Sequence, residues 1–264
     1  MKKTKFVFVA TSLLLATACL VASTFVASCG QCECIDPCVE LEDSSNFDCC
    51  GIRYNCYDPS VPTIEPPDSI SYGELLYEGQ TYKTVVIGTQ TWMAENLNYK
   101  IEGSKCFGEE GGIYNGYEGM TPIYITLSDE EVQANCDKYG SLYSWTTAMN
   151  LPSSCNTSKC ESLINSKHQG ICPEGWYLPT GDDWRIFVSA VGGRWNAFGF
   201  SALLGGWYDH KNNSFTDVDR WGLWWTASTT GYNYAYYWLI ASYPSAYGDK
   251  KNKTSLLSVR CIKN

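Results

Sequence analysis

The stretch YKTVVIGTQTWMAENLNY, residues 82–99, decides how the main domain begins. Residues 82–87 are rich in β-branched side chains, which favour an extended strand. Gly88-Thr89-Gln90 then forms a turn signal, and Thr91-Trp92-Met93 reads as a second strand. The stretch therefore predicts two consecutive strands of an antiparallel sheet.

A first helix is expected after this strand pair. Ser128 with Glu131 three residues later resembles a capping box, so a helix should open there and run through Tyr139. Gly140 breaks this helix, and residues 145–149 are expected to continue it beyond the break. Residues 151–170 are polar and are expected to form loops.

A second helix start is predicted at Thr180, followed by Asp182 and Asp183, because side-chain oxygens cap free backbone N–H groups and acids favour the helix N-terminus. Apolar residues then recur at helical spacing, at Trp184, Phe187, Val188 and Val191. From residue 199 onward, glycine- and aromatic-rich segments predict short strands, the last at residues 256–262. Strands, two main helices and strands again predict an α+β fold and not a parallel doubly wound sheet.

The N-terminus predicts export. Three lysines precede residues 6–26, which carry no charge, and small residues follow. Val26-Ala27-Ser28-Cys29 is similar to the lipobox of bacterial lipoproteins, so residues 1–28 are expected to be a signal peptide and Cys29 the lipidation site. Cys19 is a second candidate for lipidation, and both ordinary secretion and an uncleaved apolar anchor stay open. The expected location is extracytoplasmic, at the outer membrane or cell surface.

Fourteen cysteines in an exported chain indicate disulfides before metal sites. Cys32, Cys34, Cys38, Cys49, Cys50 and Cys56 lie in residues 29–57, a short segment with too few apolar residues for a core, which we interpret as a cysteine-rich neck. Their pairing is not decided by the sequence, and a metal knot is the less favoured alternative because the segment has no histidine. The proline-rich residues 58–71 predict an extended linker, with the main domain at 72–264.

The formal net charge is −9, and it falls to −12 when residues 1–28 and their three lysines are removed. Nucleic-acid binding needs a basic face, so no nucleic-acid partner is expected. The expected contact with the membrane is the N-terminal lipid, since the acidic chain has no electrostatic attraction to anionic lipid surfaces.

Five later segments follow residues 82–99 along the chain. They are KYGSLYSW at 138–145, GICPEGWYLPT at 170–180, GFSAL at 199–203, WWTAS at 224–228 and SVRC at 258–261. Together they resemble the Fibrobacter succinogenes major paralogous domain family over roughly residues 75–264. The family is known from bacterial secreted and lipoprotein chains, and the resemblance implies no particular activity.

Residues 176–184 and 259–261 are also similar to formylglycine-generating, sulfatase-modifying domains, which are relatives of the C-type lectin fold. This resemblance implies a compact C-type-lectin-like domain whose termini meet in a short sheet and whose loops display ligands. In that arrangement Cys172 would pair with Cys261, and Cys106–Cys136 and Cys155–Cys160 would be local pairs. The sulfatase-modifying chemistry does not carry over, because no cysteine lies between Cys172 and Cys261.

No catalytic residue, metal site or cofactor is predicted, and the chain is not expected to be an enzyme. His168 and His210 are its only histidines, too few for a three-histidine site, and no nucleophile elbow or phosphate-binding loop is present. We interpret His168 as a structural hydrogen-bonding residue, and Asp182 and Asp183 as helix-capping residues.

Aromatic residues gather at 221–247. Tyr234, Tyr236, Trp238 and Ile240 share one strand face by alternation, and an exposed row of this kind would be a platform for sugar rings. The favoured interpretation is instead that these rings fill the core. Two functions therefore remain: a surface-anchored module that binds polysaccharide or a protein, and a structural envelope lipoprotein with a stapled spacer domain.

Overall fold

The computed structural model describes residues 60–109, 113–115, 123–124, 126–241 and 246–264. The chain divides into two compact units, Met1–Tyr54 and Asn55–Asn264, and all described residues belong to the second. The predicted signal peptide, Cys19, Cys29 and the predicted cysteine-rich neck therefore lie outside the described residues. Among the helices that are described, none has the length and hydropathy needed to cross a membrane.

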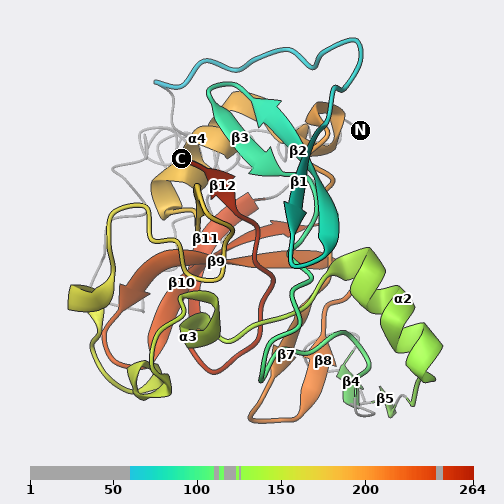
Figure 1. Ribbon diagram of the computed structural model, residues 1–264, viewed down its shortest axis with the longest axis vertical. Coiled ribbons are helices and arrows are strands. Elements are labelled where there is room, and N and C mark those ends of the chain that lie inside the picture. The colour runs from blue at the N-terminus through green and yellow to red at the C-terminus, as the bar shows by residue number, and fades with distance from the viewer. Residues whose placement is uncertain (1–59, 110–112, 116–122, 125, 242–245) are drawn as a thin grey trace, which may run out of the picture. The chain divides into compact units, whose positions relative to one another are not determined.

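The predicted strand pair forms as β2 (Gln80–Ile87) and β3 (Gln90–Met93), which are antiparallel. They lie in a five-stranded sheet of order β1-β2-β3-β12-β6, completed by β1 (Gly73–Tyr77), β6 (Trp176–Tyr177) and β12 (Ile262–Lys263). Because β12 pairs with both β3 and β6, the C-terminal strand lies in the sheet that opens the domain (Figure 1).

Two further sheets complete the domain. The first has the order β11-β10-β9 and is antiparallel, with β9 (Trp221–Thr230), β10 (Tyr234–Ala241) and β11 (Ala246–Asn252). The second has the order β5-β4-β8-β7, with β4 (Ile113–Asn115), β5 (Ile123–Tyr124), β7 (Trp207–Asp209) and β8 (Ser214–Thr216). Residues 256–258, predicted as part of a strand, instead form single bridges to residues 208, 143 and 224.

Both predicted helix starts are confirmed. In α2 (Asp129–Tyr139), the Glu131 N–H donates to Ser128 Oγ and the Ser128 N–H donates to the Glu131 carboxylate. In α4 (Gly181–Val191), Thr180 and Asp183 form the same reciprocal box, and Gly192 ends the helix in the left-handed region at φ 56°. The four-residue α3 (Trp145–Ala148) lies between them. The described elements therefore confirm a mixed α+β fold with mainly antiparallel sheets, in which the β4–β8 pair is parallel.

Aromatic side chains form the interior next to α4. The helix buries Trp184, Phe187, Val188 and Val191, as the spacing predicts. The Trp184 ring lies 4.9 Å from Trp92 of β3 and is stacked, at 3° between planes and 6.2 Å between centroids, on Trp238 of β10. Because large aromatic rings bury much apolar surface, this cluster links α4 to both sheets.

Three disulfides join Cys172 to Cys261, Cys106 to Cys136, and Cys155 to Cys160, which are the pairs that the resemblance implies. The Cys172–Cys261 disulfide ties the segment before β6 to the segment before β12, so it joins the two neighbouring strands at one side of the five-stranded sheet. Bonds of this kind form in oxidising compartments, so the three disulfides indicate an extracytoplasmic protein.

Part of the predicted linker belongs to the domain. The Ile64 N–H donates to the Ala190 carbonyl oxygen at 2.9 Å, and Arg194 Nη2 donates to the Ile64 carbonyl oxygen at 2.8 Å. The side chains of Ile64 and Ile70 also pack against the α4 core. Residues 64–71 therefore have no regular secondary structure, as expected of a proline-rich segment, but they are docked on the domain and are not a free spacer.

Buried tyrosines predict a loss of stability in alkaline solution. Burial, with the nearby Asp183 carboxylate, raises the pKa of Tyr177 to about 12, whereas an unfolded chain titrates near 10. The unfolded state therefore releases this proton first, so the contribution is complete below pH 10 and is lost as the pH rises towards 12. Between pH 9 and 11, the guanidinium midpoint should fall more for the native chain than for Tyr177→Phe. Equal falls would contradict this assignment.

Candidate functional site

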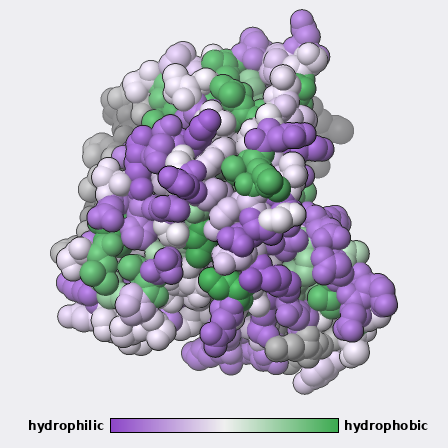
Figure 2. Space-filling view, viewed as in Figure 1, coloured by the Kyte–Doolittle hydropathy of each residue, from purple (hydrophilic) through white to green (hydrophobic). Residues whose placement is uncertain are grey.

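A cleft of about 770 Å³ opens beside α3, the β7–β8 hairpin and the strands β10 and β11. Its lining combines hydroxyl and amide groups, two aromatic rings and several titratable groups. The lining residues include Gly103, Ser144, Thr147, Asn156, Trp207, Asp209, His210, Lys211, Tyr234, Lys251, Asn252 and Thr254. Figure 2 shows a face of the molecule that is mainly hydrophilic, with hydrophobic side chains in small separate areas. Because most of its lining residues are polar or charged, the cleft suits a polar ligand.

Lys253 joins residues 155–158 to the turn between β9 and β10, next to the cleft. Its side chain is fully buried, and Nζ donates to the carbonyl oxygens of Cys155 at 3.0 Å, Ser158 at 3.3 Å and Tyr232 at 3.0 Å. The same ammonium lies 4.8 Å from the Trp145 ring centroid. These groups replace the water that a buried cation loses, and burial lowers the pKa of Lys253. Because Asn252 and Thr254 flank it and line the cleft, Lys253 is a positioning residue.

The hydroxyl wall is set by short hydrogen bonds around α3. Ser144 Oγ accepts from the Thr147 N–H at 3.1 Å and lies 2.8 Å from Thr147 Oγ1. Thr146 Oγ1 donates at 3.1 Å to Asn156 Oδ1, in the 3-10 turn η1 (Ser153–Asn156) that the Cys155–Cys160 disulfide closes. Hydroxyl and amide groups that both donate and accept are thus fixed along one side of the cleft.

The β7–β8 hairpin forms another wall of the cleft. Trp207 on β7 donates from Nε1 to Asp217 Oδ2 at 3.4 Å, which turns its indole N–H towards the protein. Lys251 of β11 places Nζ 3.3 Å from the centroid of the Trp207 ring. Asp209 accepts from the Lys211 N–H at 2.9 Å and from Asn212 Nδ2 at 2.6 Å, so its carboxylate stabilises the hairpin turn.

His210 stands exposed at the tip of this hairpin, with its ring edge-on to Tyr208 at 5.3 Å. Partial desolvation and the nearby Lys105 ammonium lower its pKa, against the opposing effect of Asp209. The imidazole is therefore held towards its neutral form at neutral pH. The Lys105 ammonium lies 5.5 Å from the centroid of the same Tyr208 ring, and so close to the rim of the cleft.

The predicted aromatic platform is wrong for Trp238. Tyr234 is 47% exposed and lines the cleft, and Tyr236 is half-buried, but Trp238 is only 2% exposed because it packs on Trp184 under α4. Ile240 is likewise buried in the same cluster. Most side chains of this row therefore lie in the core, in agreement with the favoured interpretation of the sequence. Of the row, only Tyr234 lines the cleft.

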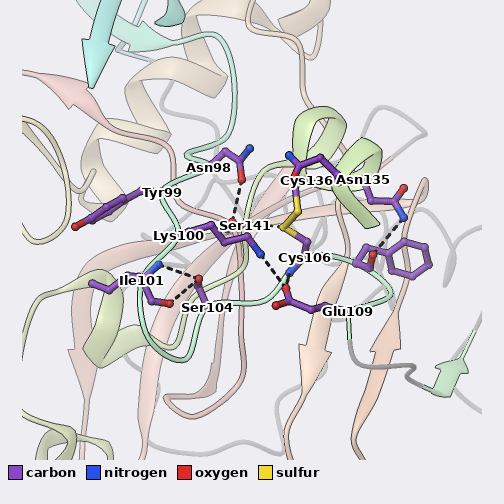
Figure 3. A network of polar contacts seen from close by, with 12 residues as sticks. Asn98, Tyr99, Lys100, Ile101, Ser104, Cys106, Glu109, Asn135, Cys136 and Ser141 are labelled. Carbon is purple, nitrogen blue, oxygen red and sulfur yellow. Dashed lines mark hydrogen bonds and ion pairs between the residues drawn. A yellow bond between two sulfur atoms is a disulfide. The ribbon is translucent and has the colours of Figure 1, made fainter. Parts of the chain in front are cut away.

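A separate polar network anchors the loop that contains Gly103 (Figure 3). Gly103 itself lines the cleft. The Glu109 carboxylate accepts from the Cys106 N–H at 2.7 Å and from Lys100 Nζ at 3.0 Å. Ser104 Oγ donates to the Ile101 carbonyl oxygen at 2.8 Å, which closes the turn. With the Cys106–Cys136 disulfide, these bonds hold residues 98–109 in place.

Several residues of the family segments meet in a buried node that is structural. Asn96 Oδ1 accepts from Trp224 Nε1 at 2.8 Å and from Arg260 Nη2 at 2.7 Å and Nε at 3.1 Å. Asn96 Nδ2 donates to the Tyr139 carbonyl oxygen at 2.8 Å. Arg260 is fully buried, and its guanidinium carbon lies 4.2 Å from the Phe200 ring centroid. The node joins five segments that lie far apart in the sequence.

His168 and Asp183 also have structural partners. His168 is buried, with Nε2 at 2.8 Å from the Met149 carbonyl oxygen and Nδ1 accepting from the Asn165 N–H at 3.2 Å. Since one ring nitrogen faces an acceptor and the other a donor, this network assigns the proton to Nε2. Asp183 accepts from Thr180 in the α4 capping box and from the Tyr177 hydroxyl at 3.2 Å. Among the described residues, no group of three or more metal-binding side chains is present.

Trp207, Asp209 and Lys251 were not singled out from the sequence. A signal was present for the hairpin, because Trp207-Tyr208-Asp209 and Ser214-Phe215-Thr216 flank the turn residues Asn212-Asn213. A hairpin tip of this kind is expected at the surface with polar side chains. No comparable signal places Lys251 over the Trp207 ring.

Comparison with known proteins supports the family resemblance over part of the chain. Residues 85–196 match the family model described as the Fibrobacter succinogenes major domain. This range contains the α3 and η1 wall of the cleft, whereas Trp207, Tyr234 and Lys251 lie beyond it. Neither a curated protein nor a solved structure matches the chain. The C-type-lectin-like fold therefore stays a prediction.

Proposed function

We propose that this chain, which carries a Fibrobacter succinogenes major domain, is a carbohydrate-binding module exported and anchored by lipid on Cys29. The observation that supports binding is the cleft, where Trp207 and Tyr234 lie among hydroxyl and amide side chains. Sugars present C–H groups to aromatic rings and hydroxyls to polar groups, so a cleft of mixed character suits them. Its volume of about 770 Å³ lies within the range of small-ligand sites.

The location within the cell envelope belongs to the same proposal. The three disulfides support maturation outside the cytoplasm, and the lipobox-like segment supports an anchor at the outer membrane or cell surface. The proposal also keeps the C-type-lectin-like fold. Support for it comes from β12, which returns to the sheet of the first strands, and from the irregular segments and hairpin that line the cleft.

We propose binding without turnover. Asp209, the described acidic residue in the lining, already accepts two hydrogen bonds within its own turn. His168 and Asp183 are held in structural hydrogen bonds away from the residues that line the cleft. These engagements favour a binding role over general acid–base chemistry.

Substitutions of two nearby tyrosines test whether sugars bind in the cleft. The purified full chain should bind a set of sugars on a glycan array, and Tyr234→Ala should weaken that binding by about tenfold or more, since stacking on an aromatic ring contributes about 1–3 kcal/mol. Tyr232→Ala is the matched control, because Tyr232 is 59% exposed two residues away but does not line the cleft. This control should bind as the native chain does.

Two results would contradict the proposal. Equal losses in the two variants would place the ligand outside the cleft. No binding to any glycan would favour the second function, a structural envelope lipoprotein whose disulfide-bonded domain is a durable spacer. Circular dichroism of both variants shows whether the fold is retained, which is expected since both tyrosines are exposed.

A further inference from the structure

We infer that the cleft selects glycans that carry carboxylate groups, such as uronate chains, and that the Lys251 ammonium binds the carboxylate. This inference rests on the proposed function. It arises from the pairing of Lys251 with Trp207 and from the charges around the cleft, neither of which is needed for binding a neutral sugar.

The Lys251 ammonium covers a face of the Trp207 ring. Its Nζ lies 3.3 Å from the ring centroid and 5.9 Å from the centroid of Tyr237. A neutral sugar that stacked on the same face of Trp207 would have to displace this cation. A uronate leaves the cation on the ring, because its carboxylate accepts a charge-assisted hydrogen bond from the ammonium. The pair therefore favours an acidic sugar over its neutral counterpart.

The balance of charge at the cleft is positive. Lys211 and Lys251 are part of the lining, and Lys105 lies close enough to help lower the pKa of His210. The acid in the described lining, Asp209, directs its oxygens to the Lys211 N–H and to Asn212. On β11, Asp249 lies two residues before Lys251, so the two side chains share one face of that strand.

This local charge contrasts with the chain as a whole, whose net charge is −9. In an acidic protein, lysines gathered around one cleft do not follow from the composition. The general acidity repels polyanions at long range, and salt screens such repulsion beyond about 10 Å. Selectivity for an anion must therefore come from contacts within the cleft, where screening is weaker.

The test compares one sugar with and without its charge. Binding of the full chain to oligogalacturonates and to their methyl esters is measured by calorimetry. The acidic form is expected to bind about tenfold more tightly or better, as one charge-assisted hydrogen bond would produce. Lys251→Met should bring the two forms to within about twofold. Lys250→Met, an exposed neighbour on the opposite strand face, should keep the native preference.

Lys211→Met gives a second variant that leaves Trp207 and its partner untouched. Lys211 is exposed at the hairpin tip, so this substitution should retain the fold and reduce the preference for the acidic form. Equal affinities of the native chain for acid and ester, or a preference kept by both Lys251→Met and Lys211→Met, would overturn the inference. Binding of neutral glycans alone would overturn it and leave the proposed function intact. Binding of no glycan would reject the proposed function itself.

Discussion

Asn96→Ala is expected to lower the free energy of unfolding by about 3–5 kcal/mol, because it leaves a buried cation without its side-chain acceptor. Asn96 Oδ1 accepts two hydrogen bonds from Arg260, whose side chain is fully buried, and one from Trp224 Nε1. Alanine removes this oxygen and leaves the Trp224 N–H without it as well. The remaining partners of Arg260 are the carbonyl oxygens of Phe200 and Ser201.

Arg260→Met is the informative companion, because it removes the cation and not its acceptor. It should cost less than Asn96→Ala, since Asn96 keeps its hydrogen bond from Trp224 and no charge is left buried. The double variant should then be more stable than the sum of the two single losses allows. Guanidinium unfolding followed by tryptophan fluorescence measures all three. A loss below about 1 kcal/mol for Asn96→Ala, or strict additivity, would show that the node does not stabilise the fold as described.

Removing the Cys172–Cys261 disulfide by alanine substitution at both positions is expected to cost about 4–5 kcal/mol. The two cysteines are 89 residues apart, and the chain-entropy account assigns long loops the larger cost. Cys155–Cys160 closes a loop of separation 5, for which the same account gives about 2 kcal/mol. Each pair of cysteines is fully replaced, so no single thiol is left to mispair.

The two double variants are compared by equilibrium unfolding under non-reducing conditions. The difference of roughly 2–3 kcal/mol between them is the quantity that the loop lengths predict. Equal losses, or a larger loss for the short loop, would mean that local effects outweigh loop entropy. One such effect is available, since the short loop supplies the Cys155 and Ser158 carbonyl oxygens that hold Lys253.

Local signals in the sequence identified much of the framework. The β2–β3 pair and the α2 and α4 helix starts depend on residues within a few positions of one another, so spacing alone reveals them. The disulfide pairs were expected from the family resemblance and not from spacing. The docking of Ile64 and Ile70 was not expected, because it depends on a hydrogen bond to Ala190 far along the chain.

The aromatic platform failed for a physical reason. Alternation along β10 separates two faces, and the structure keeps them apart: Trp238 and Ile240 pack towards α4, whereas Tyr237 and Leu239 pack into a second cluster. Both faces of this strand are covered, so neither is the polar, solvated face that alternation usually reveals. A register shift between Ala235 and Tyr237 leaves Tyr234 at the exposed end.

Sequence patterns could not predict the cleft. Its lining comes from five separate parts of the chain, at residues 103, 144–156, 207–211, 234 and 251–256. Its central support is Lys253, a residue type that is almost always exposed. Only the tertiary arrangement of three carbonyl oxygens and the Trp145 ring makes a buried lysine stable here.

The central claim is that the chain binds carbohydrate in this cleft. The most direct test is to titrate the full chain with the glycan that binds most tightly on the array. The NMR signals of the tryptophan indole N–H groups report the binding. Trp207 lines the cleft, whereas Trp184, Trp224, Trp225 and Trp238 are buried in the core. We expect a saturable shift of the Trp207 signal, which Trp207→Phe assigns, and no comparable shift of the signals of the four buried tryptophans. A saturating ligand that leaves the Trp207 signal in place would contradict it.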